Sequence, residues 1–565
     1  MRNSSAQYNL SRTLRKTASR CHVGGWHADL LYSFTFDQVC QLDRDTSAAL
    51  AAIRERRNSF IHINRVPLEI LSLIPTHLSS QDDRFRATFV CRHWRRTFLR
   101  HAALWSQLYL SMGVVYVKTL LERAKGSALD IFASSTNGDD TIRLLLPHTK
   151  QIKSLDLTDS RWADIRRLSE LNSGPLPLLR ILRISAVMMN STDALTPSPP
   201  PLFSNAVNLQ EFSLRLESWP PLNHFVFPNL TFFELSVALV EDLRVSQLLD
   251  FLEASPILQS VCMKIAGDIL LDRVPRERVV VLPNVKSFCL VMNEGEPGYK
   301  LAAHISCPSA KHTSLTHEDQ EDTDGAVSRE IFPASVSWNA IIHQYMGSPV
   351  EEVALEMKVP SGSTIECSLT FQSPDTAIIK LHFKHIAEDE DQSDGFAEMY
   401  SEVFSQACRT IQDLALLTNI KRLRICHIGI YYIQVMRVTG VGQLFKSVGP
   451  LEELVLHHCS VQAYLAPFFP PIKELTISHP LQSTFVDFDT AMVELAKSQH
   501  ALGVPFERVT VRMDRLPVEM AEMLRPWVGA VHCYEEDVGK HGCACEGRMV
   551  WQAHPHRTIC TVHYY

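Results

Sequence analysis

The chain has 565 residues, of which 45% are hydrophobic and 21% are charged, and its formal net charge is -7. This is the composition of a folded protein, and so small a net charge gives no reason to expect a nucleic-acid or membrane surface. The sequence contains no apolar run of about 18 residues, so no transmembrane helix is expected.

Residues 1–37 form a polar segment whose only charges before Asp29 are basic. The segment lacks the apolar core of a secretory signal, and we expect a disordered basic tail. A mitochondrial transit peptide has a similar composition and is the alternative.

The 14 cysteines of the chain are scattered, and several lie in apolar strings. A reduced intracellular location, in the cytoplasm, the nucleus or both, is therefore expected.

Residues 38–58 predict a helix ahead of the first compact unit. Val39, Leu42, Leu50 and Ile53 can share one apolar side of this helix. A charged run at 54–57 follows them and would lie in solvent near the end of the helix.

Residues 59–112 predict a compact unit of three helices. Pro67 suits a first helical turn, since its missing N–H needs no partner there. Ile70, Ile74 and Leu78 repeat every four residues and give the first helix an apolar face. Pro75 falls inside this helix and is expected to kink or shorten it, because an internal proline costs about 3 kcal/mol.

The second half of this unit predicts another amphipathic helix. Cys91, Trp94 and Phe98 are spaced to lie on one helical face. The unit has more apolar side chains than so small a domain can bury, Trp94 and Trp105 among them. Spare apolar surface of this kind indicates a partner.

Three strings in this unit resemble the F-box motif: Val-Pro-Leu-Glu-Ile-Leu at 66–71, Val-Cys-Arg-His-Trp-Arg at 90–95 and Leu-Trp at 104–105. With the preceding helix and the diverged repeats that follow, they are similar to the large F-box families of fungi. The resemblance implies binding to a Skp-type adaptor, which links such proteins to a cullin and a RING subunit in a ubiquitin ligase. It also implies an adaptor-facing surface formed by Pro67, Ile70, Leu71, Leu78, Val90, Cys91 and Trp94, and packing of the box onto the repeats through Leu104 and Trp105. The alternative is a helical cap on the repeats.

Residues 113–530 contain a recurring string of the form apolar-x-x-apolar-x-apolar. The last two apolar residues of each string point to one face of a strand, and stacked neighbours can bury a face that one repeat leaves exposed. The strings begin at residues 152, 179, 209, 230, 258, 285, 350, 420, 451 and 472. With helical segments such as 246–254 between them, they predict an α/β (α+β) chain: a three-helix F-box followed by a curved, leucine-rich-repeat-like solenoid. An ordinary sheet protein with frequent strands is the alternative.

Two acidic runs, 318–324 and 388–394, are expected to be solvated insertions, with a phosphorylation site or a site for a basic partner as the alternative.

Residues 531–565 form a Cys/His-rich segment or cap. Zinc is the alternative there, but Cys543-x-Cys545 is tighter than structural zinc spacing, so neither a metal site nor a cofactor is predicted.

The sequence lacks a phosphate-binding loop, a His-Glu-x-x-His motif and a Gly-x-Ser-x-Gly elbow, and Gly440-x-Gly442 stands alone. We therefore predict no catalytic residues. The predicted function is that of a non-catalytic substrate-recognition subunit of a Skp–cullin–F-box ubiquitin ligase, whose repeats bind an unidentified protein client. A repeat scaffold without a ligase is the alternative, and an intracellular hydrolase is a more distant one.

Overall fold

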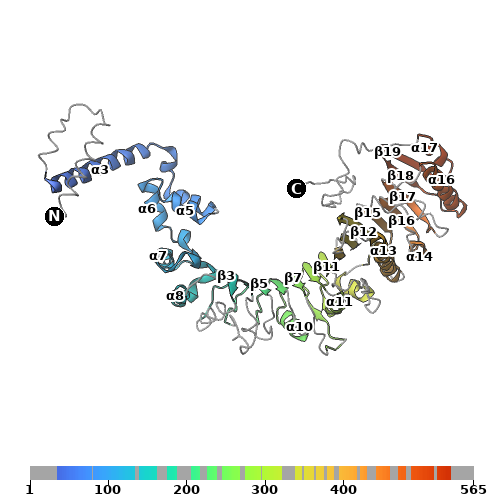
Figure 1. Ribbon diagram of the computed structural model, residues 1–565, viewed down its shortest axis with the longest axis horizontal. Helices are drawn as coiled ribbons and strands as arrows, with labels where there is room; N and C mark the ends of the chain where they lie inside the picture. Colours follow the sequence, from blue (N-terminus) through green and yellow to red (C-terminus); the bar gives the residue numbers. More distant parts are fainter. Residues whose placement is uncertain are drawn as a thin grey trace. The chain divides into compact units, whose positions relative to one another are not determined.

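The computed structural model describes residues 35–78, 80–133, 139–161, 175–187, 205–216, 226–237, 245–266, 274–275, 277–293, 295–320, 338–346, 349–361, 364–373, 378–386, 393–415, 420–428, 441–457, 469–478, 485–513 and 518–535. The chain falls into two compact units (Figure 1). The first comprises Met1–Gln107 with Lys118–Ser127, and the second comprises Leu108–Val117 with Ala128–Tyr565.

The first unit is helical where it is described. Its elements are α3 (Phe36–Asn58), η1 (His62–Arg65), α4 (Leu68–Leu73), η2 (Ile74–His77), α5 (Gln81–Ala87), α6 (Arg92–Arg100) and η3 (Ala102–Trp105). Helix α7 (Val114–Ala124) is shared between the two units. The predicted helical character of the box is confirmed.

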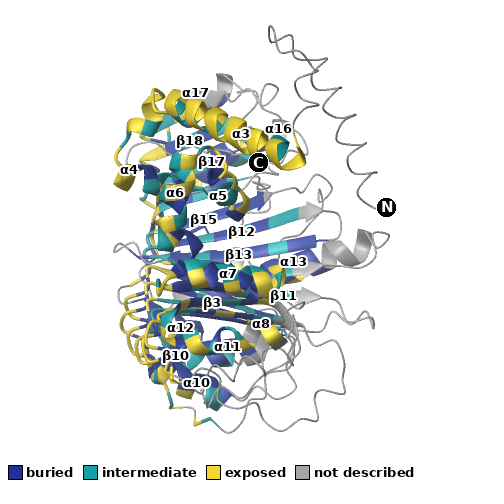
Figure 2. Ribbon diagram, turned by 90° about the vertical axis from the view of Figure 1, so that its left-hand side faces the viewer, coloured by how far each residue is buried: buried dark blue, intermediate teal, exposed yellow. Residues whose placement is uncertain are grey.

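Helix α3 confirms the helix predicted for 38–58. It begins with a capping box, in which the Thr35 hydroxyl accepts from the Gln38 N–H and the Gln38 side chain accepts from the Thr35 N–H. No residue of α3 is buried, and most of the helix carries the exposed colour in Figure 2. Near its end, Glu55 forms ion pairs with Arg92 at 3.8 Å and Arg96 at 3.6 Å, which tie α3 to α6.

Pro75 shortens the first helix of the box, as predicted. Helix α4 ends at Leu73, and the chain continues as the 3-10 turn η2. Pro75 lies in the first positions of that turn, where a backbone N–H has no helical partner to lose. The proline therefore ends the α-helix with a change of helical type and not with a kink.

The second unit is built on one large, mostly parallel sheet. Its strands are β1 (Gln107–Tyr109), β2 (Leu129–Ala133), β3 (Ile152–Arg161), β4 (Ile181–Val187), β5 (Glu211–Leu216), β6 (Phe232–Val237), β7 (Ser260–Ile265), β9 (Ser287–Met292), β11 (His312–Gln320), β12 (Glu352–Ser361), β13 (Thr364–Gln372), β14 (Ile378–Ile386), β15 (Arg422–Ile428), β16 (Leu451–His457), β17 (Ile472–Ser478), β18 (Arg508–Met513) and β19 (Ala530–Glu535). Two short strands, β8 (Val280–Val281) and β10 (Ile305–Ser306), pair separately.

The helices of the second unit connect these strands. They are η4 (Leu110–Met112), α8 (Asp139–Arg143), η5 (Leu146–Gln151), α10 (Val245–Glu253), α11 (Gly295–Ala303), α12 (Trp338–Tyr345), α13 (Ser393–Ala415), α14 (Val441–Ser447), α16 (Phe485–Ala501) and α17 (Val518–Leu524). Helix α10 confirms the helix predicted over 246–254. The mixed α/β class predicted from the sequence is also confirmed.

All ten predicted strings overlap strands of the large sheet. Along the sheet the strands follow the order β2, β3, β4, β5, β6, β7, β9, β11, β14, β13, β12, β15, β16, β17, β18 and β19. All of these pairs are parallel except the two that involve β13. The chain thus makes an antiparallel meander, β12–β14, in which sequence order and spatial order are reversed.

This meander departs from the regular repeat that the sequence predicts. Strand β14 carries the same string at Ile378-x-x-Leu381-x-Phe383, which is the signal that could have located it. Strand β11 lacks the string because Thr313 and His317 occupy two of its inward positions. The acidic insertion predicted at 318–324 is wrong in its first part, since Glu318 to Gln320 complete β11.

The core of the second unit lies between the sheet and the helices along one of its sides (Figure 1). Phe251 of α10 contacts Phe233 of β6 at a ring-centroid distance of 4.6 Å and Phe212 of β5 at 6.3 Å. On each of the neighbouring strands, the residues that point to the same face as these phenylalanines are buried. Residues out of phase, such as Arg183 and Arg215, lie on the opposite face and form cross-strand ion pairs.

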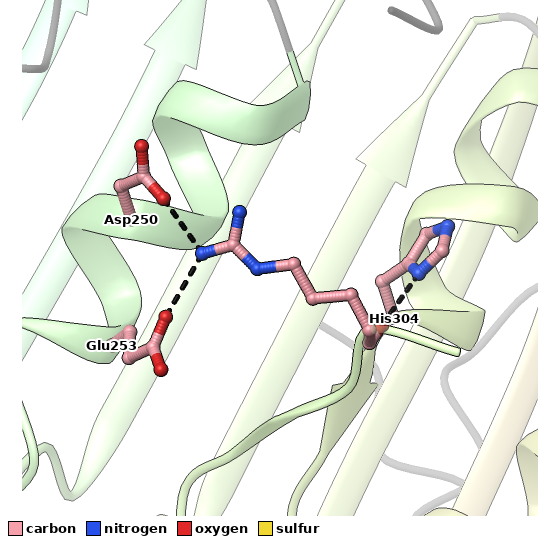
Figure 3. A network of polar contacts seen from close by, with 4 residues as sticks. Asp250, Glu253 and His304 are labelled. Carbon is pink, nitrogen blue, oxygen red and sulfur yellow. Dashed lines mark hydrogen bonds and ion pairs between the residues drawn. The ribbon is translucent and has the colours of Figure 1, made fainter. Parts of the chain in front are cut away.

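A polar network fastens the β8 segment to the helical side of the sheet (Figure 3). One Nη of Arg278 binds Asp250 at 2.6 Å and Glu253 at 2.9 Å, both on α10. The carbonyl oxygen of Arg278 accepts a hydrogen bond from Nδ1 of His304 at 2.7 Å. Together these contacts hold Arg278, next to β8, against α10 and against the residue that follows α11.

The polar face of the meander contains a histidine whose ionisation is disfavoured. Burial, together with Lys380 and Lys358, lowers the pKa of His382 to about 4. The Ser368 hydroxyl lies 2.7 Å from its Nδ1. Below its ordinary pKa the unfolded chain binds a proton that the folded chain does not, so folding stability falls as the pH drops from about 6.5 towards 4.

We therefore expect His382→Asn to flatten the acid side of the stability profile. The measurement is the denaturation midpoint of the wild type and of the variant at pH 7, 6 and 5. The wild type should lose more stability over this range than the variant, because both share every other titrating group. Equal losses of stability would contradict a lowered pKa of His382 in the folded chain.

Several predicted segments lie outside the described residues: the tail over 1–34, acidic residues 321–324 and 388–392, and the Cys/His-rich residues 536–565. Within the described ranges, no helix has the length and apolarity needed to cross a membrane. Nor do three His, Cys, Asp or Glu side chains gather there as a metal site would require.

Candidate docking surface on the helical unit

The first unit exposes large apolar side chains in three segments of its sequence, residues 60–63, 68–73 and 89–90. Helix α4 packs against α6, and α5 packs against both α6 and η2. The exposed side chains are Phe60, Ile61, Ile63, Leu68, Ile70, Leu73, Phe89 and Val90. A folded domain rarely leaves so many apolar groups in water without a use for them, so this set is a candidate docking surface.

The structure places the predicted adaptor-facing residues in three different environments. Ile70 is 53% exposed and Val90 is 59% exposed, and Pro67 is also exposed. Leu78 and Cys91 are half-buried. Ile70 and Val90 are therefore the predicted residues with the most apolar surface available to a partner.

Leu71 does not fit the predicted surface. Its side chain is completely buried, although its neighbours Ile70 and Ser72 are not. On an α-helix consecutive residues differ by about 100°, so Ile70 can face solvent while Leu71 faces the interior. Leu71 stabilises the box from within.

Trp94 is half-buried and has a structural partner. Its Nε1 donates a hydrogen bond of 2.7 Å to Oδ1 of Asn64, and the Asn64 amide donates to the carbonyl oxygen of Asn58 at 2.8 Å. The indole also meets the Phe98 ring edge-on at 5.2 Å. Trp94 thus joins α6 to the end of α3 and presents only part of its ring to a partner.

Leu104 and Trp105 are both buried. Trp105 Nε1 donates to the carbonyl oxygen of Phe98 at 3.0 Å, and its ring lies 5.4 Å from Phe85. The guanidinium of Arg123 lies 5.0 Å above the same ring. These three partners of Trp105 all belong to the first unit. The packing of Leu104 and Trp105 onto the repeats stays a prediction.

Six exposed residues of the surface were not predicted as site residues: Phe60, Ile61, Ile63, Leu68, Leu73 and Phe89. Leu73 follows Ile70 by one helical turn, and that spacing is the signal that could have identified it. Phe89 is 71% exposed, with the Arg95 guanidinium 5.8 Å from its ring.

The charge beside this surface is basic. Helix α6 carries Arg92, Arg95, Arg96 and Arg100 and no acidic residue. All four arginines are exposed, and Glu55 pairs with two of them, Arg92 and Arg96, which leaves a net positive charge. A partner with acidic groups around an apolar centre would complement this arrangement.

Comparison with known proteins agrees with this description of the unit. Residues 63–111 match the F-box-like family model. The matched segment contains α4, α5, α6 and most of the exposed apolar residues. Comparison with curated protein sequences finds no match. The chain therefore contains an F-box-like domain, followed by a mostly parallel sheet covered by helices.

Proposed function

We propose that this chain is a substrate-recognition subunit of a Skp–cullin–F-box type ubiquitin ligase. The observation that carries the proposal is the exposed apolar surface of the F-box-like domain, which includes Ile70 and Val90. F-box domains generally bind Skp-type adaptors, and such a surface would lose its contact with water on docking. Burial of large apolar side chains supplies most of the affinity in interfaces of this kind.

In this proposal the sheet is a leucine-rich-repeat-like array that binds a protein client. Parallel neighbouring strands with helices on one side support this assignment. The face without these helices carries charges of both signs, as in the row formed by Asp156, Arg183 and Glu211. A protein surface with complementary charges would bind such a face with a defined register.

The chain would act by proximity. The box holds the ligase core, the sheet holds the client, and ubiquitin transfer occurs on other subunits. Tethering raises the effective concentration of the client at the ligase without any reacting group in this chain. We accordingly propose that the chain is not itself an enzyme, and that it works inside the cell.

The alternative is a scaffold that uses the sheet for protein binding and never meets a ligase. Affinity purification of the full chain, with and without residues 63–111, followed by mass spectrometry separates the two functions. The ligase proposal expects an adaptor, a cullin and a RING subunit to be lost with the domain while client proteins remain. If the chain is a scaffold without a ligase, the purifications with and without residues 63–111 should contain the same partners.

The boundaries of the first unit predict which fragment binds the adaptor. Lys118–Ser127 belong to this unit, and Arg123 covers the Trp105 ring. We expect a fragment of residues 35–127 to fold and bind the adaptor. A fragment of 59–112 should be less stable, because it lacks both Arg123 and the Glu55 ion pairs.

Circular dichroism and calorimetry with a purified Skp-type adaptor check this expectation. A folded 35–127 fragment that does not bind the adaptor would count against the ligase proposal. Equal thermal midpoints for the two fragments would instead show that the box ends before α7.

A further inference from the structure

Two cysteines stand side by side on neighbouring strands of the sheet. Cys262 of β7 and Cys289 of β9 are direct register partners in a parallel pair. Both side chains are free thiols, and both are half-buried. Adjacent parallel strands lie about 4.8 Å apart, which is within the range of about 4.4–6.8 Å that disulfide-bonded Cα atoms span.

The two thiols lie on the face of the sheet away from the helices. Their strand neighbours Met263 and Phe288 are buried, and the Phe288 ring packs 5.2 Å from that of Tyr345 on α12. Side chains alternate along a strand, so the cysteines project to the opposite side. That side is polar and partly open to solvent, so a small reagent can reach the pair.

The pairing makes the two thiols chemically unequal. A hydrogen bond from the Cys289 thiol lowers the pKa of Cys262 to about 7, and the same bond raises the pKa of Cys289. Of the charged groups nearby, Glu234 on β6 opposes ionisation of Cys262, and Arg215 on β5 favours it. Glu234 is itself bonded to Arg215 at 2.7 Å, which offsets its effect. Near neutral pH, Cys262 is therefore the nucleophile and Cys289 keeps its proton.

We propose that Cys262 and Cys289 form a hydroperoxide-reactive pair that closes to a reversible disulfide. The Cys262 thiolate attacks hydrogen peroxide: an S–O bond forms, the O–O bond breaks, and the hydroxide that leaves takes a proton to become water. The Cys289 sulfur then attacks the sulfenic acid, forming the S–S bond and breaking the S–O bond. The second hydroxide leaves with the Cys289 proton as water. Two thiols are oxidised, one peroxide is reduced to two waters, and a dithiol reductant reverses the change.

The bridge would covalently join β7 to β9 on the polar face of the sheet. It lies between Glu234 on one side and Ser314 of β11 on the other, its register neighbours in the same cross-strand row. The proposal rests on the register and the face of the two thiols and does not depend on a ligase function.

The test is hydrogen peroxide treatment of the full chain at pH 7, followed by alkylation of the remaining thiols and peptide mass spectrometry. The expected product is a cross-linked peptide pair containing Cys262 and Cys289 that disappears on treatment with dithiothreitol. Its formation should slow about tenfold per pH unit well below pH 7, as the thiolate is lost. Cys289→Ser should instead accumulate a sulfenic acid on Cys262 that dimedone traps, and Cys262→Ser should leave Cys289 reduced at the same dose.

Cys533→Ser is the matched control, because Cys533 is half-buried in the same sheet but has Val511 as its register partner. This variant should form the cross-link at the wild-type rate. Phenylarsine oxide, which bridges adjacent thiols, should protect Cys262 and Cys289 from alkylation and leave Cys533 unprotected.

Equal oxidation of Cys289 with or without Cys262, or a stable sulfenic acid in the wild type without a cross-link, would overturn the proposal. Circular dichroism of each serine variant confirms that a lost cross-link does not reflect a lost fold.

Discussion

Replacing both Ile70 and Val90 by alanine is expected to weaken binding of the Skp-type adaptor roughly a hundredfold, if each truncation costs about 1.4 kcal/mol at the interface. Both side chains are more than half exposed in the chain alone, so their truncation leaves no cavity in the box. Calorimetry with purified adaptor measures the change in affinity. A thermal melt of the same sample should match the wild type.

Val226→Ala with Leu502→Ala is the matched control for this variant. These residues are 58% and 63% exposed, but they lie in the second unit. The control should bind the adaptor with wild-type affinity. Retention of adaptor binding by the Ile70/Val90 variant would show that the exposed apolar surface is not the docking site. Trp94 makes a poorer test because its bond to Asn64 gives it a role in the fold.

Trp105→Ala is expected to destabilise the F-box-like domain by about 3–5 kcal/mol, the usual cost of removing a buried aromatic ring. The substitution removes the contact with Phe85, the support for Arg123 and the donor to the Phe98 carbonyl. Such a loss is a substantial fraction of a typical domain stability of about 5–15 kcal/mol. Hydrogen exchange of the full chain should show faster exchange in peptides from α6, with peptides from the large sheet unchanged.

Trp105→Phe separates packing from hydrogen bonding at the same position. Phenylalanine keeps a ring against Phe85 but cannot donate to the Phe98 carbonyl, so a smaller loss of about 1–3 kcal/mol is expected. The two variants should rank in this order by hydrogen exchange. Unchanged protection of α6 in Trp105→Ala would refute an interior role for this residue.

Periodicity in the sequence predicted the elements that depend on local pattern. Helix α3, helix α10 and the ten strings of the sheet all follow from the spacing of their apolar residues. The direction of each strand could not be predicted in this way, because alternating apolar and polar residues suit a parallel and an antiparallel neighbour equally. The β12–β14 meander was therefore not predictable from the strings, even though β14 carries one.

The candidate site was predictable at the level of the motif and less so at the level of the side chain. The F-box resemblance located the domain, and the family match over residues 63–111 agrees with it. It could not show that Leu71 faces inward while Ile70 faces out, because that depends on how α4 rolls against α6. Nor could it place Arg123 over Trp105, a contact that depends on the tertiary fold.

The reversed order of the β12–β14 meander has a consequence for the synthesis of the chain. Strand β11 pairs with β14, yet β12 and β13 leave the ribosome before β14 does. At about 5–20 residues per second, the edge of β11 waits several seconds between the emergence of Gln320 and that of Ile378. An unpaired strand edge is a template for pairing with other chains. The nascent chain is therefore most open to aggregation, and most in need of a chaperone, while β11 waits for β14.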